Sequence, residues 1–349
     1  MKRVGNLWPE VVGFSNLLEA HRLARRGKRS RGEVARFERE LEKELLGLQR
    51  ELVEGSYRHG PYRLRTIQEP KSRVIASSPY RDRVVHHALC RVIEPVLTRG
   101  FIHDTYACLP GRGTHRCLDR YRYYSRRYPF VLTCDVRHFF PSIEHGTLLE
   151  LIARRIKDRR VLGLCEEIIG SFESGDPVAY APGDDLWSTC ERRAGLPIGN
   201  LTSQLFANVM LDPLDHFIKE ELRLGGYVRY CDDFCCFGPD KEELWEAREA
   251  VRQKLHGLRL RIHERKSVVR RTSEAVRFLG FELRSDGRTR VAGAGLRRFR
   301  RRLRRQRAAV AAGRLSPERL AAGVAGYLAH VGYARSRWLE ASIREQVEA

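Results

Sequence analysis

No stretch of about 18 consecutive apolar residues occurs in this sequence, which excludes a membrane-spanning helix of ordinary length. The sequence also lacks a Cys-x-x-Cys pair, and its nine cysteines are an odd number. No long apolar segment follows the basic residues at the N-terminus, so we expect no secretory signal. These absences predict a cytoplasmic protein with reduced thiols and no membrane partner.

Acidic residues are scarce relative to basic ones. The 349 residues include 65 Lys and Arg against 44 Asp and Glu, which gives a formal net charge of +21 and a pI near 10.0. A surface this positive attracts phosphate backbones of any sequence through counterion release. We therefore predict a nucleic-acid partner, although an Arg-rich composition without such a partner is an alternative. The length allows two or three lobes, because domains commonly contain roughly 100–200 residues.

Two adjacent carboxylates occupy the centre of segment 227–237. Aromatic and apolar residues flank Asp232 and Asp233 on both sides, a pattern that predicts a β-hairpin with the acids at its tip. Neighbouring carboxylates repel each other, and burying them without a counter-charge is costly, so a bound divalent cation is expected. An ordinary solvated turn is the alternative, because Asp is a common turn residue. The three cysteines of this segment are interpreted as packing residues rather than as ligands of a soft metal.

Another acid ends a β-prone segment upstream. Phe130–Asp135 is mostly apolar and stops at its carboxylate. Mg²⁺ takes oxygen ligands, typically one or two carboxylates together with water and substrate phosphates. Asp135 at a strand end beside Asp232 at a hairpin tip would supply such ligands, and two ions ~4 Å apart would promote phosphoryl transfer. Taken alone, Asp135 also fits a helix N-cap or a strand-end turn.

Three motifs follow one another in a specific order: Phe-x-x-x-x-Asp-x-x-x-x-Phe at 130–140, Gly-x-Pro-x-Gly-Asn-x-x-Ser-Gln at 195–204, and Tyr-x-Asp-Asp at 230–233. In this order they resemble the palm of a reverse transcriptase, and the resemblance runs from about Arg63 to about Leu283. It implies an α+β, right-hand polymerase fold with fingers, an antiparallel palm sheet and a short helical thumb. The implied reaction is the RNA-templated addition of deoxynucleotides to a primer 3′-hydroxyl.

The resemblance divides the chain into consecutive parts. An amphipathic helix is expected near the N-terminus, because apolar residues of segment 34–48 fall on one stripe. The predicted parts are an N-terminal helical extension at 1–55, fingers at 56–128, the first part of the palm at 129–147, fingers and an insert at 148–197, the second part of the palm at 198–290, and a basic helical thumb at 291–349.

The resemblance also assigns roles to individual residues. Two Mg²⁺ ions, for which Mn²⁺ is a possible substitute, would be bound by the catalytic aspartates and the residue after the first of them, namely Asp135, Val136, Asp232 and Asp233. Deoxynucleoside triphosphate would be bound by basic residues of a finger hairpin, a steric gate and the central motif, namely Lys71, Arg73, Arg81, Phe140, Ile198, Gly199 and Lys266. For Lys71 and Arg73 the alternative is a charged, exposed edge strand. For Lys266 it is a solvated turn residue.

Template RNA and the RNA/cDNA duplex are the implied macromolecular partners. Segment 296–307 contains eight arginines and no acid, while apolar residues recur at 296, 299, 303 and 310, so one stripe of a helix packs inward and the other faces meet phosphates. The expected template and primer contacts are Arg112, Asn200, Gln204, Phe278, Leu279, Gly280, Arg297, Arg301 and Arg304.

Segment 198–204 indicates which subfamily of reverse transcriptases the sequence resembles. It reads Ile-Gly-Asn-Leu-Thr-Ser-Gln, where most reverse transcriptases carry Gln-Gly-x-x-x-Ser-Pro, and this variant resembles the enzymes of diversity-generating retroelements. Those enzymes make errors opposite adenine and work with a small basic accessory protein, which is oligomeric. Ile198 in place of a hydrogen-bonding Gln predicts low fidelity. The alternative enzymes are a retron reverse transcriptase, a phage-defence reverse transcriptase, and a group II intron-like reverse transcriptase without an endonuclease domain. A non-enzymatic alternative is an RNA chaperone with a relic palm.

Overall fold

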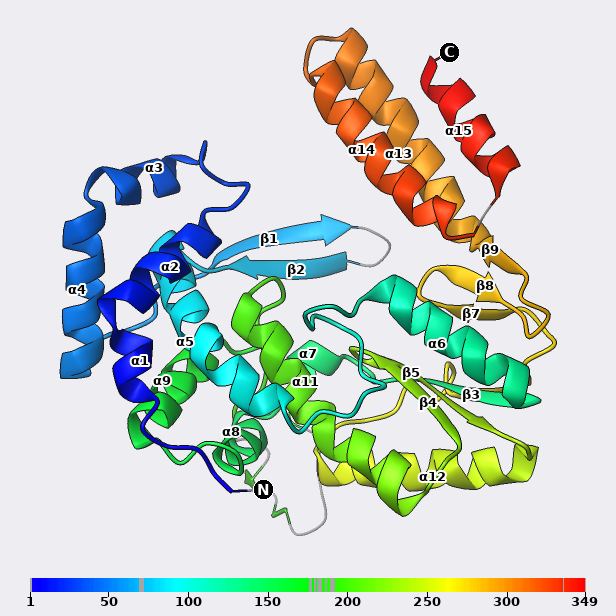
Figure 1. Ribbon diagram of the computed structural model, residues 1–349, viewed down its shortest axis with the longest axis horizontal. Helices are drawn as coiled ribbons and strands as arrows, with labels where there is room; N and C mark the ends of the chain where they lie inside the picture. The colour runs from blue at the N-terminus through cyan, green and yellow to red at the C-terminus, as the bar shows by residue number, and fades with distance from the viewer. Residues whose placement is uncertain are drawn as a thin grey trace. The chain divides into compact units, whose positions relative to one another are not determined.

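The computed structural model divides the chain into two compact units. Unit 1 comprises residues 1–108, 135–223 and 249–263, and unit 2 comprises residues 109–134, 224–248 and 264–349. Figure 1 shows the helices and strands by label and by colour along the chain. The residues that the structure describes are 2–68, 72–175, 178, 180, 184–185, 187–188, 192–334 and 336–348.

The N-terminal part of unit 1 is helical. Each helix buries one apolar stripe, which contains Leu17 in α2, Leu45 in α4 and Leu89 in α5, all with 0% exposure. The helices are α1 (Trp8–Val12), α2 (Phe14–Ala24), α3 (Gly32–Arg39), α4 (Leu41–Glu54) and α5 (Tyr80–Thr98).

The expected amphipathic helix over 34–48 is in fact two helices, which corrects the prediction. The apolar stripe is buried as expected, but the backbone of Glu40 leaves the helical region at φ −119° and ψ 36°. Glu40 is the N-cap of α4, and its carboxylate lies 2.9 Å from Lys43 in the first turn. An acid at a helix N-terminus interacts favourably with the helix dipole, which favours a new helix start here.

An antiparallel hairpin and further helices complete unit 1. Strands β1 (Arg63–Gln68) and β2 (Ser72–Ser77) pair antiparallel, as the sequence predicts, with Arg63 opposite Ser77. The remaining helices are α7 (Phe139–Ser142), α8 (His145–Ala153), α9 (Arg159–Gly170), α11 (Leu201–His216) and the π-helix η1 (Phe217–Glu221). Helix α11 packs against α5 and α8, and ten of its residues between Leu205 and Asp215 are buried.

An antiparallel sheet forms the centre of unit 2. Its strand order is β4-β5-β3-β6, and helix α6 covers β4 and β5. The bounds of these elements are α6 (Thr114–Arg127), β3 (Phe130–Asp135), β4 (Gly226–Tyr230), β5 (Asp233–Gly238) and β6 (Val268–Arg271). Helix α12 (Lys241–Gly257) follows β5 and leads from unit 2 into unit 1.

The C-terminal part of unit 2 is a small sheet followed by three helices. The sheet has the order β7-β8-β9, with strands Val276–Phe278, Phe281–Leu283 and Thr289–Val291. Helix α14 (Pro317–Gly332) packs on both α13 (Gly293–Ala311) and α15 (Arg337–Glu348), as the orange and red ribbons of Figure 1 show. In the described part of the chain, no helix is both long and apolar enough to span a membrane.

Candidate active site and nucleic-acid interface

The predicted hairpin with carboxylates at its tip is confirmed. Strands β4 and β5 pair antiparallel with Tyr230 opposite Asp233, so only Cys231 and Asp232 form the turn. Cys231 has φ 57°, a left-handed conformation that costs a residue with a Cβ roughly 1–2 kcal/mol. Two-residue hairpin loops need positive φ in the turn, which explains this conformation. Asp232 therefore lies in the turn and Asp233 begins β5, and both are half-buried.

The strands behind the tip belong to the core. Burial raises the pKa of the Cys235 thiol well above its usual range, so this thiol stays protonated at neutral pH. A protonated thiol is a poor metal ligand, which supports the interpretation of the hairpin cysteines as packing residues. The hairpin side chains with 0% exposure include Tyr227, Val228, Phe234, Cys235, Cys236 and Phe237.

One functional candidate that sequence reasoning missed is Arg229. Its side chain has 0% exposure, and its Nη1 donates a hydrogen bond to the backbone carbonyl of Cys231 at 3.1 Å. Burying a guanidinium this deeply is costly unless its donors are hydrogen-bonded, and the Cys231 carbonyl provides one of the acceptors. The signal in the sequence is a charged residue inside an apolar strand just before the two acids. Arg229 holds the turn that carries Asp232.

Strand β3 ends at Asp135, as predicted, and lies next to β5 in the sheet. On its other side it pairs with β6, where Thr133 is opposite Val268. At Asp135 the chain passes into unit 1, where the backbone N–H of His263 donates to the Asp135 carbonyl at 2.7 Å. Val136, predicted to join the metal site, has a buried side chain. The meeting of the three carboxylates stays a prediction.

Metal-ligand chemistry fits these carboxylates. Asp232 and Asp233 are half-buried, which leaves hard oxygen donors accessible at the tip. Among the described residues, no group of three or more His, Cys, Asp or Glu side chains has the arrangement of a metal site. A Mg²⁺ site with one or two carboxylates, completed by water and substrate phosphates, does not need such a group.

The segment before α11 contains two glycines in conformations that other residues rarely adopt. Gly195 has φ 122° and Gly199 has φ 112°. A Cβ on Gly199 would lie 3.1 Å from Ile75 of β2, and the Ala76 N–H donates to the Ile198 carbonyl at 3.2 Å. At Gly199 the backbone is therefore approached closely by strand β2. An approach by substrate stays a prediction.

Asn200, a predicted template or primer contact, has a structural role in unit 1. Its side chain is only 4% exposed, its Nδ2 donates to the Ala76 carbonyl at 3.0 Å, and its Oδ1 accepts from the Ser78 hydroxyl at 2.8 Å. These bonds attach the start of α11 to the end of β2. Gln204, by contrast, is exposed on the first turn of α11. Nucleic-acid contacts of both residues stay predictions.

Comparison with known proteins decides the family. The family model described as "Reverse transcriptase (RNA-dependent DNA polymerase)" matches residues 67–283, more than half of the chain, and includes both acid-bearing segments. The chain belongs to the reverse transcriptase family. The α+β fold with antiparallel sheets agrees with the right-hand polymerase fold expected for this reverse transcriptase.

Relatives of this reverse transcriptase include proteins of group II introns. It is 26% identical to protein YkfC of Escherichia coli over 284 residues, which cover 69% of this chain and 71% of YkfC. It is 22% identical to the group II intron-encoded protein LtrA of Lactococcus lactis over 301 residues, which cover 67% of this chain and 48% of LtrA. The chain thus spans about half the length of LtrA.

Among solved structures, the apo telomerase of Candida tropicalis matches with a TM-score of 0.48 and 12% identity, over 65% of this chain and 48% of the telomerase chain.

The predicted nucleotide-binding residues of the fingers lie on different elements of unit 1. Arg73 is exposed on β2, whereas Lys71 lies outside the described residues. Arg81 lies in the first turn of α5, where its guanidinium forms an ion pair with Glu51 of α4. A triphosphate would have to compete with that carboxylate for Arg81.

Phe139 and Phe140 differ in burial. Phe139 is 3% exposed and belongs to the core, while Phe140 is half-buried, with ring centroids 5.5 Å apart. Phe140 is therefore partly accessible, and its role as a steric gate stays a prediction.

Two further predicted residues lie in unit 2. Arg112 is half-buried in the loop before α6, and Lys266 is exposed just before β6. The backbone carbonyl of Lys266 accepts a hydrogen bond from the Thr133 hydroxyl at 3.2 Å, which attaches this turn to β3.

The predicted primer contacts Phe278, Leu279 and Gly280 form a tight hairpin between β7 and β8. Phe278 is opposite Phe281, and the two-residue turn consists of Leu279 at φ 48° and Gly280 at φ 86°. Positive φ at both positions is typical of a type I′ turn. The Phe278 side chain is buried and stacks on Tyr121, so the accessible tip is Leu279–Gly280.

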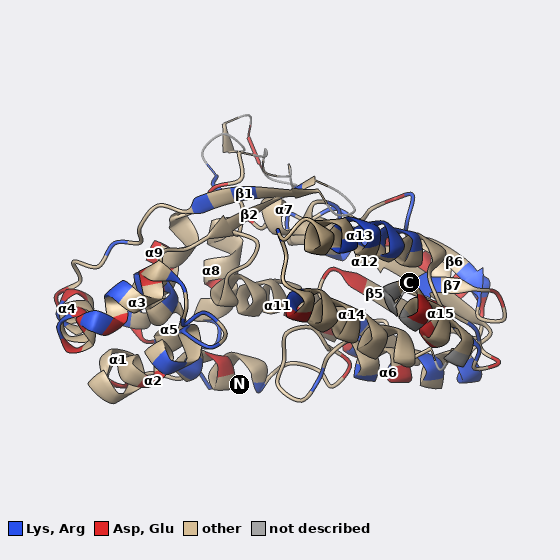
Figure 2. Ribbon diagram, turned by 90° about the horizontal axis from the view of Figure 1, so that it is seen from above, with Lys and Arg blue, Asp and Glu red and all other residues tan. Residues whose placement is uncertain are grey.

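Helix α13 has the predicted division between an apolar stripe and cationic faces. Phe299 and Leu303 are buried against α14 and α15, and the Phe299 ring stacks on Tyr327. The predicted duplex contacts Arg297, Arg301 and Arg304 are all exposed. Figure 2 shows Lys and Arg concentrated along α13, which fits a helix that meets phosphates.

Proposed function

We propose that this chain is an RNA-directed DNA polymerase that extends a primer 3′-hydroxyl on a template RNA. The match of residues 67–283 to the reverse transcriptase family carries the proposal. Asp135 and Asp232 would hold two Mg²⁺ ions, with Asp233 as a weaker ligand or supporting charge. Once bound, such ions supply activation of the attacking hydroxyl and stabilisation of the leaving oxygen.

The protein's own residues would position the reactants. Arg229 fixes the turn that carries Asp232, and the half-buried Phe140 ring would exclude a ribose 2′-hydroxyl. Arg73 and Lys266 would meet the triphosphate and the departing pyrophosphate. The hairpin tip at Leu279–Gly280 would position the primer, while exposed arginines of α13 would follow the duplex along its phosphates.

We also propose error-prone copying of adenines, as in diversity-generating retroelements. The supporting observation is Ile198, which is half-buried and carries no side-chain hydrogen-bonding group where most reverse transcriptases have Gln. A site without that polar contact discriminates less well between right and wrong nucleotides. A small basic accessory protein would be the partner in such a system.

A group II intron-like role is the second candidate, and the similarity to LtrA over 67% of this chain favours it. Retron and phage-defence roles belong to the same class of alternatives. Sequencing cDNA made on defined RNAs separates these roles: errors concentrated at template adenines support diversification, whereas uniformly accurate copies contradict it. Products made without any template would instead favour a defence enzyme.

Incorporation of labelled deoxynucleotides on an RNA template with a DNA primer tests the polymerase itself. We expect activity with Mg²⁺ or Mn²⁺ that Asp232→Ala abolishes. Equal incorporation by the wild type and by Asp232→Ala, or none by the wild type, would contradict the proposal.

A further inference from the structure

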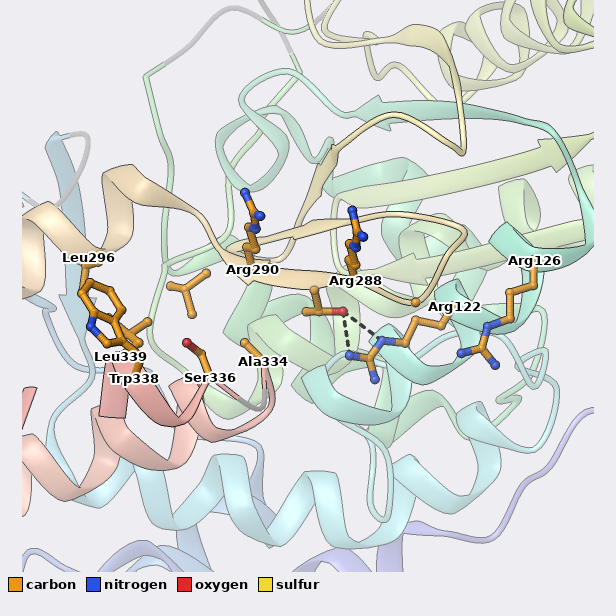
Figure 3. Close-up of a pocket in the computed structure, with 12 residues that line it drawn as sticks. Arg122, Arg126, Arg288, Arg290, Leu296, Ala334, Ser336, Trp338 and Leu339 are labelled. Atoms are coloured by element: carbon orange, nitrogen blue, oxygen red, sulfur yellow. Dashed lines mark hydrogen bonds between the residues drawn. The ribbon is translucent and has the colours of Figure 1, made fainter. Parts of the chain in front are cut away.

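A pocket of about 730 Å³ lies in unit 2, and none of the residues that line it is a predicted catalytic, nucleotide-binding or template/primer-binding residue. It is formed by β9 and the turn before it, by α6, and by the segments that begin α13 and α15 (Figure 3). The side chains and backbone that line it include four arginines and no acid: Arg122, Arg126, Gly287, Arg288, Thr289, Arg290, Val291, Leu296, Ala334, Ser336, Trp338 and Leu339. Such a lining fits an anionic ligand.

The arginines form one end of this pocket. The Arg122 guanidinium donates to the Thr289 hydroxyl at 2.7 Å, and Asp119 lies 3.7 Å away. Arg290 of β9 and Arg288, just before that strand, are exposed, and Figure 3 shows their side chains pointing the same way. Arg288 lies 3.6 Å from Asp286.

Two of the four arginines have no acidic partner. Within the described part of the chain, no carboxylate lies within 4.0 Å of Arg126 or Arg290. Gly287 lets Arg126 approach the turn, since a Cβ there would lie 3.2 Å from the Arg126 guanidinium. Glu282 of β8 is opposite Arg290, but its carboxylate pairs with Arg277 at 2.9 Å, so Arg126 and Arg290 keep guanidinium donors for a phosphate.

The other end of the pocket is apolar and aromatic. Figure 3 shows Trp338 with Leu296 and Leu339 on the side opposite Arg122 and Arg126. Trp338 is 74% exposed, whereas Leu339 is buried. An exposed indole ring beside a cationic end is a platform on which a nucleobase can stack.

A second hollow of about 340 Å³ continues from the pocket along α6. It shares Arg122 and Arg126 with the pocket and adds Asp119, Tyr123 and Arg127. Tyr123 is 45% exposed, and the Arg127 guanidinium lies 5.2 Å from its ring centroid. The two hollows together present two exposed rings, Tyr123 and Trp338, beside several arginines, and we name their lining residues the α6–β9 surface.

We propose that the α6–β9 surface binds single-stranded RNA outside the template–primer duplex. Phosphates would meet Arg126 and Arg290, and bases would stack on Trp338 and Tyr123, the combination typical of single-strand binding without sequence preference. An acidic protein segment would use the arginines but has no need of two exposed rings. The proposal goes beyond the polymerase function, whose strand path uses the hairpin tip at Leu279–Gly280 and α13.

Fluorescence anisotropy of the full chain with a short unstructured oligoribonucleotide, without Mg²⁺ or nucleotides, tests the proposal. Over about 50–200 mM salt, Arg126→Ala with Arg290→Ala should reduce the slope of log affinity on log salt by about 1.4, because each single-strand phosphate contact contributes ~0.7. The control removes the same charge from exposed residues of α3, Arg36→Ala with Arg39→Ala, and should leave the slope unchanged.

The aromatic part of the proposal has its own test. Trp338→Ala should weaken binding about 5- to 100-fold without changing the salt slope, and Trp338→Phe should restore most of the affinity. Circular dichroism of each variant shows whether it is folded.

Unchanged RNA binding by the folded double-arginine variant overturns the proposal. A second outcome also overturns the proposal, in favour of an acidic protein partner. In that outcome the double-arginine variant loses RNA binding, Trp338→Ala does not, and a polyglutamate peptide competes for the surface as well as RNA does. The polymerase proposal is tested separately, because Asp232→Ala should bind the oligoribonucleotide normally.

Discussion

Replacing the buried Arg229 with Met should slow nucleotide addition while the protein stays folded. The lost hydrogen bond runs from a charged donor to the Cys231 carbonyl at 3.1 Å, a type that contributes about 1.5–3 kcal/mol. This hydrogen bond offsets the cost of the left-handed conformation of Cys231, which is roughly 1–2 kcal/mol. Without the bond, the turn no longer favours its observed conformation. Methionine has a similar length, but it leaves the polar partners of the buried guanidinium unpaired, so global stability should also fall.

Single-turnover incorporation of one deoxynucleotide measures this effect. The rate should fall about 10- to 100-fold, which corresponds to about 1.4–2.8 kcal/mol. Cys231→Gly, which removes the cost of positive φ, should restore part of the rate in the Arg229→Met background. A rate within twofold of wild type for folded Arg229→Met, with urea unfolding as the check on folding, would refute the argument that Arg229 holds the turn.

Three further predictions concern selectivity, fidelity and stability. Phe140→Ala should raise the use of ribonucleotides relative to deoxynucleotides at least about tenfold in competition assays, and unaltered sugar selectivity would sink the steric-gate assignment. Ile198→Gln should reduce errors opposite adenine about fivefold, as one added hydrogen bond of about 1 kcal/mol allows; an unchanged error spectrum in sequenced cDNA counts against it. Burial lowers the pKa of His86 to about 3, and neither ring nitrogen has a hydrogen-bond partner. Below the unfolded-state pKa near 6.5, the His86 ring takes up a proton only in the unfolded state. The free energy of unfolding therefore decreases as the pH is lowered, by about 2 kcal/mol from pH 7 to pH 5. Urea unfolding of His86→Phe should show this part of the pH dependence removed.

The parts of the fold predicted from sequence are those with local signals. Alternating apolar residues and a polar turn predict β1 and β2, and aromatic runs around two acids predict the β4–β5 hairpin. The stripe through Phe299 and Leu303 predicts which face of α13 is buried. In each case the pattern within about ten residues is enough to decide the element.

The features missed either leave the apolar pattern unchanged or depend on contacts between distant segments. The break at Glu40 does not interrupt the apolar stripe, so periodicity alone cannot reveal it. Asn200 carries a motif position, yet its hydrogen bonds go to Ala76 and Ser78, more than 120 residues earlier. The α6–β9 surface joins residues from opposite ends of unit 2, and only folding brings them together.

Counting bound Mn²⁺ by electron paramagnetic resonance tests the central claim most directly. The measurement uses the protein with RNA template, DNA primer and an incoming nucleotide that cannot be cleaved. Two ions per wild-type molecule are predicted, with both Asp135→Ala and Asp232→Ala losing tight binding of at least one. Full retention of two tightly bound ions by Asp135→Ala would contradict the account.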